Sequence, residues 1–140
     1  MMKQMATGLL IMCCSASALA VSGSWSDSKA GITLQNRGQM ASALTLSPSA
    51  NAPVMQMPSA VIDTISWSYS LLGPEPAGLQ VQLCSSSNRC QHLDAAQGQT
   101  RNFFGQSAQS SFRLVFGVEG QGRLNPPLRV VSQQVIVNYR

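Results

Sequence analysis

The sequence predicts an all-β protein, a small antiparallel β-sandwich or barrel-like domain. Two segments, residues 61–72 and 112–118, alternate apolar and polar side chains with a period of two and are rich in β-branched and aromatic residues. Clusters of Gly, Pro, Ser and Asn separate these and other short apolar runs. No segment after residue 20 shows a sustained helical period. Several short strands separated by turns are typical of a sandwich or barrel.

Residues 1–20 have the three parts of a cleavable secretory signal peptide. Lys3 supplies a positive start, an apolar stretch follows, and Ala18-Leu19-Ala20 matches the small-residue pattern that signal peptidases cut. The predicted cut lies between Ala20 and Val21, with Ala16-Ser17-Ala18 as the second choice. The apolar run is about a dozen residues long, whereas a membrane-spanning helix needs ~20. We therefore expect residues 21–140 to form one exported domain with a single core.

The remaining elements can be assigned in chain order. A short strand is expected at 32–34, and the stretch 40–60 is expected to be a loop or at most an irregular edge strand, because its three prolines cannot donate to a sheet. Residues 61–72 and 79–84 are predicted to pair as a hairpin through the turn cluster 73–78. A second hairpin joins 79–84 to 91–94, and 102–104 is a candidate strand. Glycines at 120–122 predict a hairpin turn, and strands at 128–131 and 134–139 follow a Pro126-Pro127 turn.

Cysteine usage favours a disulfide. Cys13 and Cys14 leave with the signal peptide, so Cys84 and Cys90 remain as an even pair in an oxidising compartment. The closed loop is short, so its stabilisation is at or below about 3 kcal/mol. A zinc site with His92 and Asp94 is the alternative, but an oxidised pair supplies no thiolates and a spacing of six residues is unusual for zinc.

The residues that could act as acids, bases or nucleophiles are too few and too scattered to suggest an enzyme. His92 is the one histidine, the five acidic residues are spread thinly, and no nucleophile-elbow or metalloprotease motif is present. The net charge of the chain is +4 and falls to +3 when Lys3 is removed with the signal peptide. The lysines and arginines form no basic stripe, so no nucleic-acid partner is expected. Met40, Met55 and Met57 could bind copper(I), although loop packing is the favoured interpretation. No cofactor or metal is expected, and no membrane span after residue 20.

Two sets of side chains are candidates for binding. Arginines can pair with carboxylates and are enriched at interfaces, so Arg123, Arg129 and Arg140 near the C-terminus form a candidate partner-binding patch. Aromatic rings can stack on sugars, so a carbohydrate- or envelope-binding sandwich is the alternative function. Its platform would be Trp25, Trp67 and Tyr69, unless their alternation buries them.

The chain resembles the FlhE family, whose members are encoded with the flagellar export genes of enteric bacteria. The resemblance depends on many short sequence matches that occur in the same order and spacing. The matching segments are 23–28, 31–38, 67–69, 73–79, 83–84, 89–90, 93–94, 122–128 and 134–140. The resemblance implies a periplasmic, non-enzymatic flagellar protein that supports assembly and swarming. It also implies contact with the export apparatus or rod, as a chaperone or plug that limits proton leak through the export channel. The protein is expected to act as a monomer.

Overall fold

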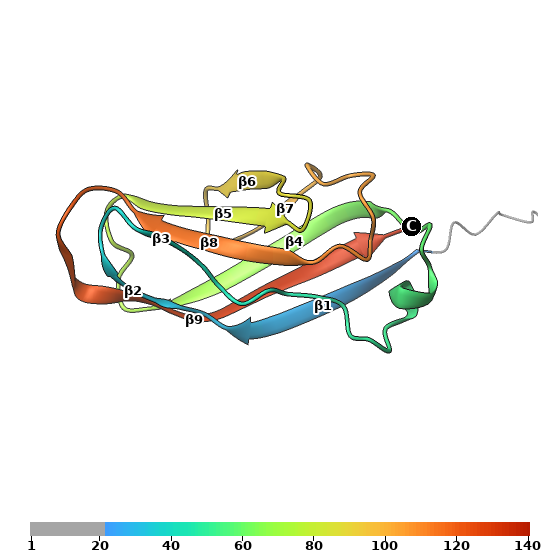
Figure 1. The fold of residues 1–140 in the computed structure, drawn as a ribbon, viewed down its shortest axis with the longest axis horizontal. Coiled ribbons are helices and arrows are strands. Elements are labelled where there is room, and N and C mark those ends of the chain that lie inside the picture. The colour runs from blue at the N-terminus through green and yellow to red at the C-terminus, as the bar shows by residue number, and fades with distance from the viewer. Residues whose placement is uncertain (1–21) are drawn as a thin grey trace, which may run out of the picture.

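Nine β-strands within residues 22–140 form two antiparallel sheets that pack face to face (Figure 1). These are the residues that the computed structural model describes, so the predicted cleavage site between Ala20 and Val21 lies outside them. The all-β sandwich prediction is confirmed. A single turn of 3₁₀ helix, η1 (Pro53–Gln56), interrupts the loop that was expected between residues 40 and 60.

The longer sheet is built around the C-terminal strand. Its order is β1-β9-β4-β7, and β2 pairs with the first half of β9. The strands are β1 (Gly23–Ala30), β2 (Thr33–Asn36), β4 (Ile62–Leu72), β7 (Gln97–Thr100) and β9 (Arg123–Tyr139).

The shorter sheet covers one face of the longer one and has the order β3-β8-β5-β6. Its strands are β3 (Met40–Ser42), β5 (Leu79–Ser85), β6 (Cys90–Leu93) and β8 (Phe112–Val118).

Alternating residues of the two sheets meet in one core. Ile65, Trp67 and Tyr69 of β4 point into it, while the intervening Ser66 and Ser68 remain partly exposed. From the shorter sheet, Phe112, Leu114, Phe116 and Val118 point the same way, as their period of two predicted. Burial of such side chains is the main stabilising contribution of a sandwich, at about 1.5–3 kcal/mol for each large apolar residue.

The loop after β3 closes one side of the sandwich. It bonds to the shorter sheet through Leu46, whose N–H donates to Phe112 O at 2.7 Å. It also bonds to the longer sheet, since Gln133 Nε2 donates to Leu44 O at 2.9 Å and Asp27 Oδ2 accepts from Ser47 N at 2.9 Å. Gln133 is 1% exposed, and this bond satisfies its buried Nε2, whereas its Oε1 has no hydrogen-bond partner among the described residues.

The predicted hairpin between 61–72 and 79–84 is wrong. β4 lies in the longer sheet between β9 and β7, whereas β5 lies in the shorter sheet between β8 and β6. Both sides of each strand are therefore taken by other partners. The turn cluster 73–78 carries the chain from one sheet to the other, and its prolines offer no donors to continue a ladder. The glycine-rich segment 120–122 is also a connection between sheets, from β8 to β9, and not a hairpin turn.

Two further strand assignments differ from expectation. Residues 102–104 form a turn, and the strand is the polar segment β7 just before them. The expected strands 128–131 and 134–139 are one continuous strand, β9, that also includes Pro126 and Pro127. These prolines are tolerated because the β2–β9 register shifts between Leu34 and Asn36, and β4 reaches only as far as Arg129 on the other side.

Candidate functional site

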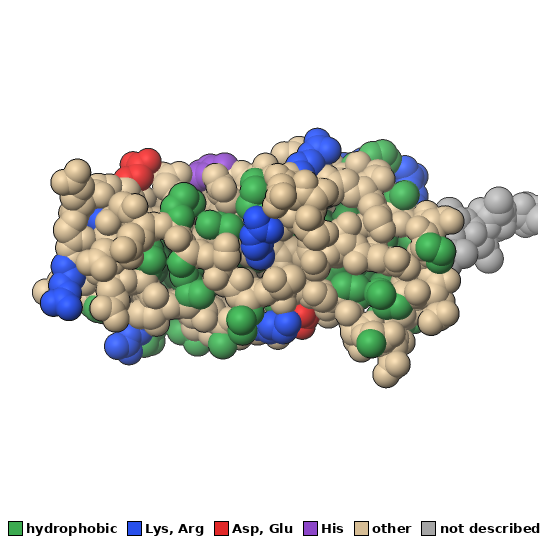
Figure 2. Space-filling view, viewed as in Figure 1, with side chains coloured by type: hydrophobic (Ala, Val, Ile, Leu, Met, Phe, Trp, Pro, Cys, Tyr) green, Lys and Arg blue, Asp and Glu red, His purple; other side chains and the backbone are tan. Residues whose placement is uncertain are grey.

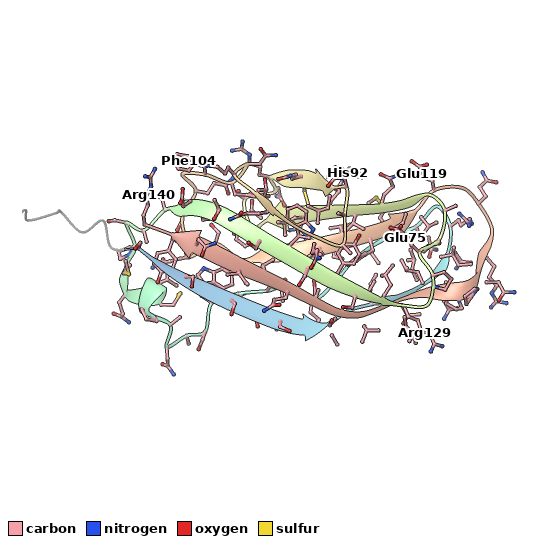
Figure 3. All side chains as sticks on the ribbon, turned by 180° about the vertical axis from the view of Figure 1, so that it is seen from behind. Glu75, His92, Phe104, Glu119, Arg129 and Arg140 are labelled. Atoms are coloured by element: carbon pink, nitrogen blue, oxygen red, sulfur yellow. A yellow bond between two sulfur atoms is a disulfide. The ribbon has the colours of Figure 1, made fainter. Side chains whose placement is uncertain are left out.

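An exposed phenylalanine stands between two arginines at the end of the sandwich where the chain terminates. The guanidinium carbons of Arg101 and Arg140 each lie 4.9 Å from the centroid of the Phe104 ring. Phe104 is 42% exposed, and Figure 3 shows it beside Arg140. Arginine stacked on an aromatic face is attracted by the negative charge of the π-system, at about 0.5–1 kcal/mol for exposed sites.

The backbone fixes these three side chains. Phe103 is buried and packs edge-on against Phe112, with ring centroids 5.4 Å apart, which anchors the turn that presents Phe104. The N–H of Phe104 donates to Arg101 O at 2.9 Å. The Arg140 backbone is held on both sides, because its N–H donates to Val61 O and its carbonyl accepts from Val61 N. The aromatic ring is therefore exposed from a rigid frame.

A groove of about 360 Å³ adjoins Arg140 on the side of η1. Its lining is Arg140 and the consecutive residues Gln56, Met57, Pro58, Ser59 and Ala60. Hydrophobic side chains also gather over the η1 end of the molecule in Figure 2. We call Arg101, Phe104, Arg140 and this groove the terminal surface.

The two arginines of the terminal surface differ in their electrostatic environment. Arg101 Nη2 lies 3.5 Å from Asp63 Oδ1, and both side chains are largely exposed, so water screens the pair. Arg140 makes no ion pair with any side chain of residues 22–140. Its guanidinium N–H groups are therefore able to donate hydrogen bonds to a carboxylate of another molecule, in the planar, paired geometry that arginine favours.

The arginines singled out from the sequence do not form one patch. β9 begins at Arg123 and ends beside Arg140, so Arg123 and Arg140 occupy opposite ends of a 17-residue strand. Figure 3 shows Arg140 at one end of the molecule and Arg129 well separated from it, toward the other end. Nearness in sequence did not imply nearness in space because an extended strand rises about 3.3 Å per residue.

The disulfide lies at the end of the β5–β6 hairpin, away from any catalytic arrangement. Cys84 and Cys90 are directly paired, with a Cα–Cα distance of 4.0 Å, and their sulfurs are bonded. His92 and Asp94 are exposed beyond this bond. Among the residues that the structure describes, no three His, Cys, Asp or Glu side chains are placed to share a metal ion.

The three methionines considered as copper(I) ligands do not lie at one site. Met40 lies in β3 opposite Gly117, while Met55 and Met57 belong to η1 and the residue after it, toward the other end of the sandwich (Figure 1). Met57 packs partly against the core, as the packing interpretation requires. Met55 is 39% exposed beside the terminal surface.

The three candidate sugar-stacking rings are buried. Trp25, Trp67 and Tyr69 are 6%, 6% and 7% exposed, and the two indole N–H groups donate to Ala108 O and Ala95 O. Burial, and to a lesser degree the negative charge of Glu75, raises the pKa of the Tyr69 hydroxyl above 10.0. An aromatic platform for sugars is therefore absent from these positions.

The charges on the surface are dispersed. Figure 2 shows Lys and Arg side chains set apart from one another on the face it presents. Within residues 22–140, no helix is long and apolar enough to cross a membrane. Among the described residues, Arg101 and Arg140 are the arginines that stack on an aromatic ring, at the end of the sandwich where β9 ends.

Comparison with known proteins identifies the family. The model of the family described as "Flagellar protein FlhE" matches residues 31–140. The chain belongs to the FlhE family. It is 49% identical to the flagellar protein FlhE of Salmonella typhimurium LT2 over 84% of this chain and 85% of that one. The Escherichia coli K12 protein of the same name is 43% identical over the same shares.

Solved structures agree with this assignment. A crystal structure of FlhE superposes with a TM-score of 0.77 and 48% identity, covering 85% of this chain and 97% of that one. A serine protease of Aeromonas sobria superposes with a TM-score of 0.63 at 12% identity, over 85% of this chain and 27% of the protease. That second likeness is one of fold alone. The FlhE relatives are named as flagellar proteins, so the role of this chain is flagellar.

Sequence reasoning identified Arg140 but missed its two neighbours. Arg101 and Phe104 come from the turn after β7, which was expected to be a polar stretch and a brief strand. The available signal was the pair Phe103-Phe104. In the structure Phe103 is 1% exposed and Phe104 is 42% exposed.

Proposed function

We propose that this FlhE-family chain is exported to the periplasm and acts there by binding a protein of the flagellar export apparatus or rod. The signal peptide is removed after Ala20, and residues 21–140 are the working domain. Binding supports flagellar assembly and swarming and limits proton leak through the export channel. The observation that carries the proposal is the family match over residues 31–140, together with the composition of residues 1–20.

The terminal surface is the contact site in this proposal. Phe, Met and Arg are enriched at protein interfaces, and a few such residues supply most of the binding energy. Phe104 is held in place before any partner arrives, so binding loses little side-chain entropy. The site lies where β9 ends, close to the turn of the disulfide hairpin, whose Ser87 Oγ donates to Gln106 Oε1 at 3.2 Å.

The protein is non-enzymatic in this proposal. Exposed His92 has no acid–base partner among the described residues, and the FlhE relatives are named as flagellar proteins, not as enzymes. The alternative, in which aromatic rings stack on sugars, loses support because all three candidate rings are buried.

Site-specific crosslinking in motile cells tests the proposal. A photo-reactive amino acid at position 104 is expected to capture a protein of the flagellar basal body, while the same group at the exposed position 121 captures none. Capture at neither position, together with normal swarming of a deletion strain, contradicts the proposal.

A further inference from the structure

The outer face of the longer sheet carries no charge across its centre. Four strands contribute to it, and the strand registers place their outward residues in rows, such as Ser26, Ile136, Ser66 and Gln99. We call this the uncharged face, and its members are Ser24, Ser26, Ser28, Thr64, Ser66, Ser68, Ser70, Gln97, Gln99, Ser132, Gln134, Ile136 and Asn138.

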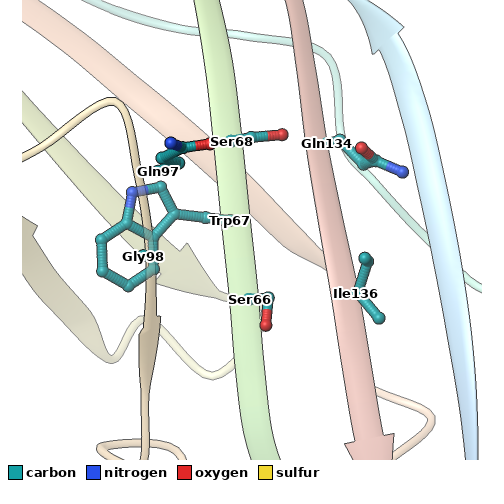
Figure 4. A pocket seen from close by; sticks show the side chains of 7 residues that line it. All are labelled: Ser66, Trp67, Ser68, Gln97, Gly98, Gln134 and Ile136. Carbon is teal, nitrogen blue, oxygen red and sulfur yellow. The ribbon is translucent and has the colours of Figure 1, made fainter.

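A groove of about 340 Å³ runs along β4 on this face (Figure 4). Its floor is formed by the small side chains of Ser66 and Ser68 and by the small exposed part of Trp67 beside Gly98. Gln97 stands on one side, and Gln134 and Ile136 stand on the other. The groove exists because the serines of β4 and Gly98 of β7 leave space between the longer side chains on the neighbouring strands.

The end of the groove is preorganised. Gln99 Nε2 and Asn138 Nδ2 both donate to Thr64 Oγ1 at 3.1 Å, which fixes two amides across the sheet. The side chains of Ser66, Ser68 and Gln134 make no hydrogen bond with other residues of the described chain. Their hydroxyl and amide groups can therefore serve a ligand.

The chemistry of the face suits a neutral polar chain better than a protein. Serine is depleted at protein interfaces. The face has no arginine, and its one aromatic contribution, from Trp67 in the groove floor, is 6% exposed, too little for an interface anchor. Hydroxyl and amide groups match sugar hydroxyls and acetamido groups, which both donate and accept hydrogen bonds. Ile136 is 37% exposed and offers an apolar contact to a methyl group or a ring face.

We propose that this groove binds a glycan strand of N-acetylated sugars, laid along β4. The binding uses hydroxyl and amide groups and requires no aromatic stacking. It is separate from the terminal surface, so one molecule can hold a flagellar protein and a glycan at the same time. In the periplasm the glycan of this class is the cell-wall strand, and that placement alone depends on the proposed function.

Cosedimentation of the purified protein with peptidoglycan sacculi, and titration with an oligomer of N-acetylglucosamine, test the proposal. Since the contacts are uncharged, binding is expected to persist at about 0.5 M NaCl, where Debye screening removes long-range attraction. Ser68→Gln fills the groove and Gln134→Glu replaces a donor with a charge, so each is expected to weaken binding by about tenfold. Gln121→Glu, the same change on an exposed loop, is expected to have no effect.

Three results would overturn the proposal. The first is no binding to either probe by a folded protein. The second is binding to sacculi that salt abolishes and both groove variants leave unchanged, which indicates attraction by the scattered arginines. The third is a dimer that Gln134→Glu dissociates, which indicates that a second copy covers the face. None of them affects crosslinking at position 104, so the proposed flagellar contact is tested separately.

Discussion

Gly98 of β7 faces Trp67 of β4 with no space for a side chain between them. A Cβ atom at position 98 would lie 2.6 Å from Cη2 and Cζ2 of the indole ring. The ring is 6% exposed, and its Nε1 donates to Ala95 O at 3.0 Å. The glycine therefore lets a large core residue lie flat beneath a short edge strand, and Figure 4 shows the ring behind β7.

Gly98→Ala is expected to lower the free energy of unfolding by about 1–3 kcal/mol, because the added methyl group overpacks the indole. Urea unfolding followed by Trp fluorescence measures the change. Gln97→Ala, on the same strand but with an exposed side chain, is the control and is expected to stay within about 0.5 kcal/mol of the parent. Equal stability of the two variants contradicts the packing argument.

Replacement of both Cys84 and Cys90 by alanine is expected to lower the free energy of unfolding by up to about 3 kcal/mol, since a short closed loop restricts the unfolded chain only modestly. Chemical denaturation with and without reductant measures this. Reductant is expected to shift the midpoint of the parent protein and leave the double variant unchanged. An unshifted parent midpoint, with free thiols verified by mass spectrometry, contradicts the prediction.

Tyr69 is expected to make stability fall at alkaline pH. Burial favours the neutral phenol and raises its pKa above 10.0 in the folded state, so the unfolded chain loses this proton first. The stabilisation is complete below the unfolded pKa and is lost as the pH rises through the folded pKa. Tyr69→Phe removes this loss.

The measurement for Tyr69 is the difference in free energy of unfolding between the parent and Tyr69→Phe across the pH range. It is expected to stay constant near neutral pH and to move in favour of Tyr69→Phe above about pH 10. A difference that is flat at every pH shows that Tyr69 ionises equally in both states. Glu75→Gln removes the smaller electrostatic cause and should shift the effect only slightly.

The strands that could be predicted from the sequence are those with one buried and one exposed face. β4 and β8 show this alternation clearly, and the β5–β6 hairpin follows from its polar turn between two cysteines. β7 could not be found, because its inward residues are Gly98 and Thr100 and its outward residues are glutamines. Its place in the sheet is set by backbone pairing with β4, which leaves no apolar period.

Pairing partners were harder to predict than strands. Consecutive strands were expected to form hairpins, yet β4 and β5 lie in different sheets, because β9 is long enough to occupy one whole side of β4. The same strand separates Arg123 from Arg140, while a turn distant in sequence brings Arg101 and Phe104 to Arg140. The candidate site thus depends on tertiary contacts that no local pattern contains.

Phe104→Ala is expected to weaken capture of the flagellar partner by about tenfold, since truncating an anchor residue typically costs more than 1 kcal/mol. Arg140→Ala should act in the same direction, because its guanidinium supports the Phe104 ring and faces outward. Both side chains are exposed, so the stability of the fold should change little. Complementation of a deletion strain for swarming, with periplasmic protein levels matched by immunoblotting, measures the consequence.

Arg129→Ala is the matched control, since it removes an exposed arginine of the same strand that lies far from the terminal surface (Figure 3). It is expected to complement fully. A swarming defect with Arg129→Ala and none with Phe104→Ala would move the contact to the other end of the sandwich. Swarming defects with both Arg129→Ala and Phe104→Ala would indicate a partner that contacts the sandwich along β9. An extended strand rises about 3.3 Å per residue, so a small contact cannot include both positions.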